Sequence, residues 1–144
     1  MFSRLFTKTY HKLSFEDVQF GMQHPEQFVI INTLPIQDQG CLIENTIPYT
    51  EEEHTINALL EQTMLMNKKF IIYGRNNMDE TIYTKCDQLT NLGFQSVYLY
   101  IGGLFEWLTL QDIYGKDEFR TTIYTLDILK YKPTRIFGSY MITN

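Results

Sequence analysis

The sequence predicts a single α/β domain with a mostly parallel central sheet and helices on both faces. Three short apolar runs, rich in β-branched and aromatic residues, have the length of buried strands and cover residues 28–31, 69–73 and 97–101. Segments with a helical spacing of apolar residues separate these runs, which is the pattern of consecutive βαβ units. With 144 residues, the chain is long enough for one domain with its own hydrophobic core.

The first helix is expected directly after Ser14. A serine is a favourable N-cap residue, and the acidic residues Glu16 and Asp17 suit the first turn of a helix. Apolar residues continue at helical spacing to Met22, and Pro25 then ends the helix. The first strand run follows immediately after this proline.

A second helix is expected between the first two strand runs. Residues 37–40 are polar, and residues 41–48 form a loop that holds at most a short strand. Thr50, with Glu53 three residues later, fits a capping box. Apolar residues at helical spacing then extend this helix to Met64.

The central strand run leads into a polar loop and then into a third helix. This helix is expected from about Asp79 to Leu92, and Gly93 is a natural C-terminal stop. Ligands of parallel sheets bind beyond the carboxyl ends of the strands. The free N–H groups of a helix start also favour an anion. The loop at residues 74–80 is therefore the first candidate for a site.

The end of the chain divides into a last strand and an aromatic extension. Gly102 and Gly103 form a turn after the last strand run, and a weaker helical signal occurs at 125–129. We divide the chain into a basic N-terminal arm at 1–12, a domain at 13–115 and a C-terminal extension at 116–144. Because the extension is dense in apolar and aromatic residues, we expect it to pack on the domain or on a partner.

Charge and composition exclude several functions. The net charge is −5, and all acidic residues except Asp117, Glu118 and Asp127 lie within residues 13–115, which argues against nucleic-acid binding. No apolar run reaches about 18 residues, so no membrane span is expected. The three histidines have no ligand spacing, so neither a metal nor a cofactor is expected.

Two cysteines without a disulfide framework fit a reducing compartment, and a cytoplasmic location is expected. The basic start of the chain has too few Arg and Ser residues to indicate a mitochondrial presequence.

Several motifs occur in the order found in one known family. Residues 92–98 (Leu-Gly-Phe-Gln-Ser-Val-Tyr), followed by Gly102-Gly103 and Trp107, resemble the C-terminal signature of rhodanese-like domains. Asn32 stands where that family has the acid of an Asp-Val-Arg-like motif, and Cys41 stands where it has the histidine of a Gly-His-Ile-Pro-Gly-like turn. The resemblance covers roughly residues 12–112 and implies a rhodanese-like fold.

The resemblance breaks at the residues that carry the chemistry. The family places a nucleophilic cysteine directly after the central strand, where this chain has Gly74. It also places a cation near the start of the following helix, where this chain has Asp79 and Glu80. Acids there suit the helix dipole but repel an incoming thiosulfate or phosphate. Arg75 either offsets this repulsion in part or points to solvent.

The candidate binding site has two parts. The loop contributes Gly74, Arg75, Asn76, Asn77, Met78 and Asp79. Residues expected near the loop are Asn32, Gly102, Gly103 and Trp107. The asparagines either bind a ligand or satisfy the backbone of a tight turn.

These observations favour a catalytically inactive rhodanese-like protein that serves as a binding or structural module. It would bind a protein partner or self-associate through the C-terminal extension. The alternatives are a sulfurtransferase whose nucleophile has moved to Cys41, a hydrolase that uses Asp79 or Glu80, and an anion sensor. Cys41 is expected to be exposed and Cys86 to be a small buried hydrophobe.

Two runs near the end of the domain carry a further resemblance. Residues 102–108 and 110–115 are similar to runs in rhodanese-like proteins of large DNA viruses and some protists. A virion location and a virion or assembly partner would then be among the options.

Overall fold

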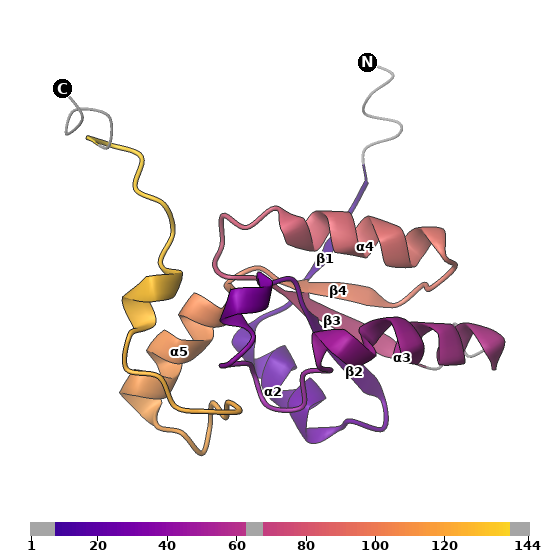
Figure 1. The fold of residues 1–144 in the computed structure, drawn as a ribbon, viewed down its shortest axis with the longest axis horizontal. Coiled ribbons are helices and arrows are strands. Elements are labelled where there is room, and N and C mark those ends of the chain that lie inside the picture. The colour runs from indigo at the N-terminus through magenta and orange to yellow at the C-terminus, as the bar shows by residue number, and fades with distance from the viewer. Residues whose placement is uncertain (1–7, 63–67, 139–144) are drawn as a thin grey trace.

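The computed structural model describes residues 8–62 and 68–138, which form a domain around a four-stranded sheet. The strands are β1 (His11–Lys12), β2 (Phe28–Asn32), β3 (Lys69–Tyr73) and β4 (Val97–Tyr100). Their order is β1–β4–β3–β2, and every neighbouring pair is parallel (Figure 1). The predicted α/β class is therefore confirmed, and the central strand lies between two neighbours as expected.

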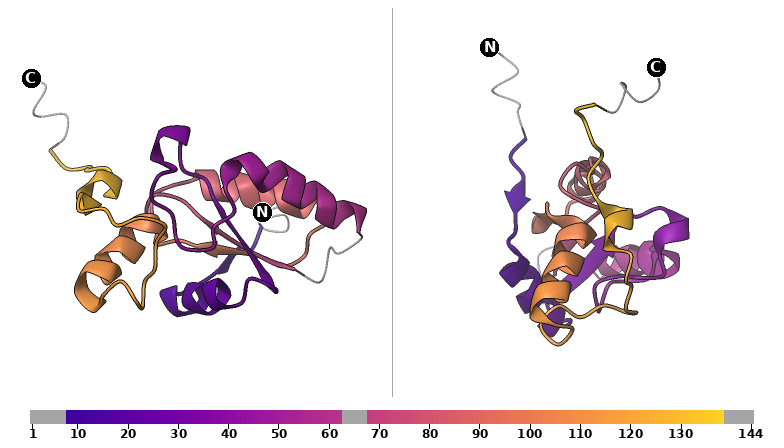
Figure 2. Two further views of the ribbon diagram at one scale, coloured as in Figure 1. Left: turned by 60° about the horizontal axis from the view of Figure 1, so that its bottom comes forward. Right: turned by 90° about the vertical axis from the view of Figure 1, so that its left-hand side faces the viewer.

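Within residues 8–62 and 68–138, four α-helices cover the sheet, two on each face (Figure 2). Helices α2 (Phe15–Gln23) and α5 (Gly103–Tyr114) pack on one face, and α3 (Tyr49–Glu61) and α4 (Thr81–Asn91) pack on the other. Within the described ranges, no helix is both long enough and apolar enough to span a membrane.

Strand β3 shows why the sheet is buried on both sides. Its residues Phe70 and Ile72 belong to the core beneath α3 and α4, whereas Ile71 and Tyr73 belong to the core beneath α2 and α5. All four side chains are fully buried. Alternate residues of a strand point to opposite faces, so a continuous apolar run fills both cores at once.

The helix boundaries match the sequence at some ends and differ at others. The predicted Ser14 cap is confirmed: the Asp17 N–H donates to Ser14 Oγ, and the Ser14 N–H donates to Asp17 Oδ2 at 3.0 Å. The predicted Thr50 cap is wrong, because α3 starts at Tyr49 and has no side-chain cap. Pro48 is the N-cap instead, with φ −56°, an angle that the proline ring already fixes, so the helix begins two residues earlier than a Thr50 cap implies.

Two short elements carried little signal in the sequence. Strand β1 consists of two exposed polar residues, and backbone pairing with β4 alone defines it, with His11 opposite Tyr98. The 3₁₀ helix η2 (Ile128–Tyr131) lies slightly beyond the helical segment predicted at 125–129. Gly93 adopts φ 111° after α4, as its predicted stop requires. The predicted continuation of α3 to Met64 lies outside the described residues.

The C-terminal extension folds back along the domain as far as η2 (Figure 1). Phe119 and Tyr131 are almost fully buried in the core beneath α2 and α5. The Thr122 N–H donates to the Leu42 carbonyl at 2.8 Å, so the extension also bonds to the loop before α3. The described part of the extension therefore contributes to the core of the domain.

We expect Phe119→Ala to lower the free energy of unfolding by about 3–5 kcal/mol, the usual cost of truncating a buried Phe. The matched control is Phe137→Ala in the same extension. Phe137 is 90% exposed, so its truncation should stay within about 0.5 kcal/mol of the unchanged chain. Urea denaturation measures both values. Equal values for the two variants would mean that the extension does not pack on the domain in solution.

Candidate functional site

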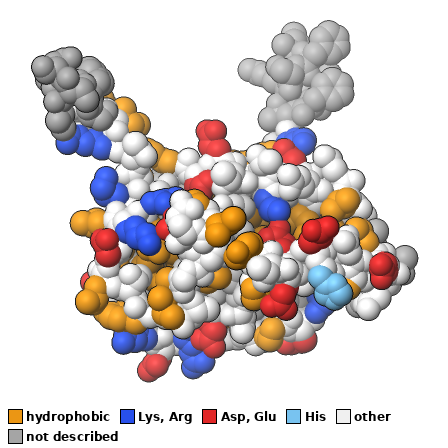
Figure 3. Space-filling view, in the orientation of Figure 1, with side chains coloured by type: hydrophobic (Ala, Val, Ile, Leu, Met, Phe, Trp, Pro, Cys, Tyr) orange, Lys and Arg blue, Asp and Glu red, His pale blue; other side chains and the backbone are white. Residues whose placement is uncertain are grey.

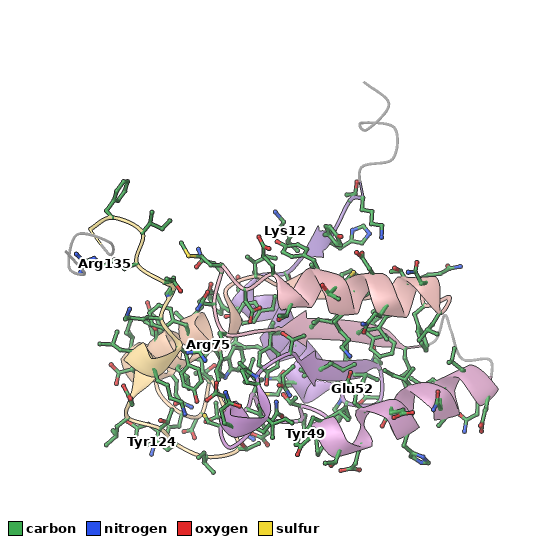
Figure 4. The ribbon with its side chains drawn as sticks, turned by 45° about the horizontal axis from the view of Figure 1, so that its top comes forward. Lys12, Tyr49, Glu52, Arg75, Tyr124 and Arg135 are labelled. Atoms are coloured by element: carbon green, nitrogen blue, oxygen red, sulfur yellow. The ribbon has the colours of Figure 1, made fainter. Side chains whose placement is uncertain are left out.

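The loop after β3 lies where the carboxyl ends of the parallel strands meet the C-terminal extension. Asn32, the last residue of β2, is in register with Tyr73, the residue before Gly74. Figure 4 labels Arg75 at this junction. An open hollow of about 350 Å³ adjoins the loop and is lined by Thr33, Pro35, Arg75, Asn76, Met78, Asp79, Thr81, Lys132 and Thr134. It is the position at which a parallel sheet usually binds a ligand.

The carboxylate of Asp79 turns back into the loop. Its Oδ2 atom accepts the Arg75 N–H at 2.9 Å, and its Oδ1 atom accepts the Thr81 N–H at 3.0 Å. The Thr81 hydroxyl also donates to Oδ1 at 2.5 Å. N–H groups at the start of a helix favour an anion, and here the chain supplies that anion itself.

Gly74 leaves the space that this carboxylate occupies. A Cβ atom at position 74 would lie 2.3 Å from Asp79 Oδ2 and 3.0 Å from Thr33 Oγ1. Gly74 is not among the glycines with positive φ, so its backbone angles would accept a side chain. A side chain here would require the Asp79 carboxylate to move from its present position, and the same holds for the side chain of a nucleophilic cysteine.

Arg75 is engaged by the segments that flank the loop. Its Nη1 atom donates to Asp38 Oδ2 at 2.9 Å, and its Nη2 atom donates to the Lys130 carbonyl. Lys130 Nζ lies 3.3 Å from Asp38 Oδ1, and the hydrogen bond to Asp38 raises the pKa of Lys130. Asp38 is 4% exposed, and a buried carboxylate is stable only when it is paired. We call these three residues the Arg75–Asp38–Lys130 cluster.

Asn76 shapes the loop and also connects it to the C-terminal extension. Its side-chain carbonyl accepts the Met78 N–H at 2.9 Å, which makes an Asx turn. Its side-chain amide donates to the Tyr131 carbonyl at 2.9 Å. Asn76 is buried, whereas Asn77 and Met78 are exposed at the tip of the loop. The polar groups of Asn76 are therefore used within the chain, and the exposed tip remains available for a contact.

Gly103 lets α5 approach the loop. It adopts φ 66°, and a Cβ atom there would lie 2.8 Å from both the Asn76 nitrogen and the Gly74 carbonyl oxygen. The Leu104 and Phe105 N–H groups donate to the carbonyls of Gly74 and Arg75 at 2.9 and 2.8 Å. The first donors of α5 are thus bonded to the loop.

The other residues expected near the loop have structural partners. The side chain of Asn32 is buried, and its Oδ1 atom accepts the Leu34 N–H and the Gln39 amide. Trp107 lies in the core, and its indole N–H donates to the Arg120 carbonyl at 3.0 Å. Gly102 and Asn77 line a second hollow, of about 440 Å³, at the start of α5. Among the residues expected near the loop, Gly103 lies against the loop backbone, as described above.

Both cysteines are buried. The predicted exposure of Cys41 is wrong: it is 3% exposed, because the C-terminal extension covers it and its thiol lies 3.5 Å from the Ile123 carbonyl oxygen. The predicted burial of Cys86 is confirmed. Burial raises the pKa of both thiols, which disfavours the reactive thiolate. Among the described residues, no group of three or more His, Cys, Asp or Glu side chains could hold a metal.

Sequence reasoning missed Asp38, Thr81 and Lys130. Asp38 and Lys130 meet only in the folded chain, so no local pattern reveals them. Thr81 follows Asp79 by two residues, and an aspartate often bonds to the backbone two residues on. That local pattern could have predicted that the Asp79 carboxylate turns into the loop.

We expect Gly74→Ala and Asp79→Ala to be coupled in a double-mutant cycle. Gly74→Ala alone should destabilise the fold, because its methyl group meets the Asp79 carboxylate. In the double variant that contact is absent, so the loss should fall short of the sum of the single losses by about 1 kcal/mol or more. Urea denaturation measures the cycle.

Gly40→Ala is the matched control, since a Cβ atom there would meet nothing within 4 Å. It should show no coupling to Asp79→Ala. Additive losses for Gly74→Ala and Asp79→Ala would mean that the carboxylate does not fill the space beside Gly74.

Comparison with known proteins supports the fold. No protein-family model matches the chain, and no curated protein matches it by sequence. Among solved structures, it is similar to the yeast protein Ygr203w, described as a protein tyrosine phosphatase of the rhodanese family. The TM-score is 0.58 at 18% identity, over 85% of this chain and 99% of that chain.

The Alr3790 protein from Anabaena sp. aligns with a TM-score of 0.43 at 18% identity, over 76% of this chain and 81% of that chain. At 18% identity a structural likeness bears on the fold alone. The similarity to Ygr203w shows that the chain has a rhodanese-like fold.

Proposed function

We propose that this chain is a rhodanese-fold binding module that carries out no thiol chemistry at the loop after β3. The observation that carries the proposal is the position of the Asp79 carboxylate, 2.3 Å from where a Cβ atom of residue 74 would lie. Covalent catalysis needs a nucleophile, and Gly74 has no side chain to supply one. An anionic substrate would also have to displace a carboxylate that already holds the N–H groups of Arg75 and Thr81.

Phosphatase activity, named for the yeast protein of similar fold, has no counterpart in this loop. Arg75 is the one cation among residues 74–80, and Asp38 and the Lys130 carbonyl already engage its guanidinium. The loop thus lacks both a nucleophile and an unpaired cation that could hold a phosphate. Fold alone does not imply activity, because activity depends on the residues of the site.

The alternative nucleophile, Cys41, is poorly suited to sulfur transfer. Burial raises the pKa of its thiol, and the Ile123 carbonyl lies against the sulfur. A persulfide on this thiol would need room and a stabilising cation. Cys41 instead lies in the buried apolar core with Tyr73 and Tyr131.

Binding of a protein partner is the function that remains for these surfaces. The loop tip exposes Asn77 and Met78, and the C-terminal extension exposes several large apolar side chains. The Asp79 carboxylate bonds to the N–H groups of Arg75 and Thr81 and so restrains the loop. A restrained loop suits a contact surface, since a preorganised surface loses less entropy on binding.

Incubation with thiosulfate, followed by intact mass measurement and peptide mapping, tests the proposal. We expect no sulfur adduct on Cys41 or Cys86 at pH 7. As a control, iodoacetamide should modify both thiols quickly in urea and slowly in the folded chain, because burial raises their pKa values. A stoichiometric adduct on Cys41 that cyanide removes would overturn the proposal in favour of a sulfurtransferase.

A further inference from the structure

The C-terminal extension has buried side chains on the side that faces the domain and exposed apolar side chains on the other side, which we call its outer face. Phe119 and Tyr131 are the inner anchors, and both are almost fully buried. Six large apolar side chains between residues 123 and 137 are exposed, by fractions that range from 47% for Tyr124 to 90% for Phe137. We define the outer face by these six residues: Ile123, Tyr124, Leu126, Leu129, Ile136 and Phe137.

This outer face is denser in apolar groups than an ordinary surface. Single exposed apolar residues are normal, whereas a concentration of them marks an interaction site. The buried anchors Phe119 and Tyr131 hold the extension against the domain. One outer-face residue also has a partner within the chain, because Lys116 Nζ lies 3.8 Å from the centre of the Tyr124 ring. In Figure 1 the last described residues lead away from the domain, so a partner could reach both of their sides.

Positive charge accompanies the outer face. Residues 123–138, which include the outer face, contain Lys130, Lys132 and Arg135 and one acidic residue, Asp127. Lys130 shares Asp38 with Arg75, yet 45% of its side chain remains exposed. Figure 3 shows Lys and Arg side chains beside hydrophobic ones on the side of the molecule where η2 lies. An apolar centre with charged groups around it is the usual anatomy of a protein interface.

The charge argues against a second copy as the partner. A symmetric contact between two identical outer faces would place the basic segment 128–138 of one copy against that of the other. Like charges set opposite each other at an interface cost several kcal/mol. A partner with acidic groups would instead gain from the same three cations.

The charge also argues against a membrane or a nucleic acid. The whole chain carries a net charge of −5, so a large anionic surface would repel most of the domain. Salt screens charges beyond about 8–10 Å. A short acidic segment can therefore lie on residues 128–138 without being repelled by the acidic residues farther away on the domain.

We infer that the outer face binds an acidic protein segment whose apolar side chains pack among Leu126, Leu129 and Phe137. The cations Lys130, Lys132 and Arg135 pair with the acidic groups of that segment. This inference rests on the proposed function as a binding module and names the chemistry of the partner.

Selection from a random-peptide display library on the immobilised full chain tests the inference. The expected result is enrichment of peptides that combine Asp or Glu with large apolar residues. A synthetic peptide of the most enriched sequence should lose at least tenfold in affinity for a chain carrying Leu126→Ser and Leu129→Ser. It should lose as much for Lys132→Glu with Arg135→Glu, and its affinity should fall as salt is raised.

Matched surface changes elsewhere provide the controls. Ile36 on η1 (Ile36–Asp38) is 71% exposed, and Lys12 on β1 is also exposed. Ile36→Ser and Lys12→Glu should leave the affinity unchanged. All variants alter exposed side chains, so equal melting temperatures would show that a loss of affinity is not a loss of folding.

Several outcomes would overturn the inference. One is enrichment without an acidic bias; another is no enrichment above that seen with an unrelated protein. A dimer in light scattering that Leu126→Ser with Leu129→Ser abolishes would assign the outer face to a second copy. Flotation with phosphatidylcholine–phosphatidylserine vesicles, lost in the same variant, would assign it to a membrane. A thiosulfate adduct on Cys41 would overturn the proposed function without changing any of these results.

Discussion

The Asp79 carboxylate is the group on which the structure of the loop depends. This carboxylate accepts the part-buried N–H of Arg75 and the exposed N–H of Thr81 at once, and a hydrogen bond to a charged acceptor is stronger than one between neutral groups. With the loop fixed in this way, the carbonyls of Gly74 and Arg75 face α5 and accept its first N–H groups. The Asp79 side chain thus helps to fix both the loop conformation and the position of the first turn of α5.

The C-terminal extension is joined to this loop by polar contacts as well as by packing. Asn76 donates to the Tyr131 carbonyl, and Arg75 donates to the Lys130 carbonyl. Asp38 then receives both cations of the Arg75–Asp38–Lys130 cluster. Asp38 is the buried member of this cluster, and removing both cations would leave its carboxylate unpaired, which costs far more than the net value of the pairing. The extension and the loop are therefore expected to be held or released together.

The two faces of the extension explain how one segment can stabilise the domain and still contact a partner. Its inward side chains complete the core beneath α2 and α5, and its outward side chains have the apolar and basic character of an interface. The rhodanese-like fold supplies a rigid sheet for this arrangement. The loop that serves catalysis in the resembling family here anchors the extension to the sheet.

Local patterns in the sequence predicted the sheet and several element ends. Apolar runs predicted β2, β3 and β4, because strands buried on both faces need continuous apolar residues. Ser14 predicted the start of α2 and Gly93 the end of α4, because caps and stops depend on local geometry alone. The loop after β3 as a candidate site stays a prediction, and so does Gly74 as the residue in place of a nucleophile, which rests on the family resemblance and not on a local pattern.

Features that depend on contacts distant in sequence could not be predicted. The burial of Cys41 depends on the return of residues 119–123, some eighty positions later, as its contact with Ile123 shows. The role of Asp38 depends on two cations from other segments. Strand β1 could not be predicted from an apolar run, because it has none and is defined by its backbone pairing with β4.

The central claim is that the loop is filled by its own carboxylate and does not accept an external anion. Amide ¹H–¹⁵N spectra of the full chain, recorded during titration with inorganic phosphate and with thiosulfate, test it most directly. The account predicts that the Arg75 and Thr81 amide signals stay in place, because both N–H groups already donate to Asp79. A saturable shift of these two signals in the unchanged chain would contradict the claim and identify the loop as an anion-binding site.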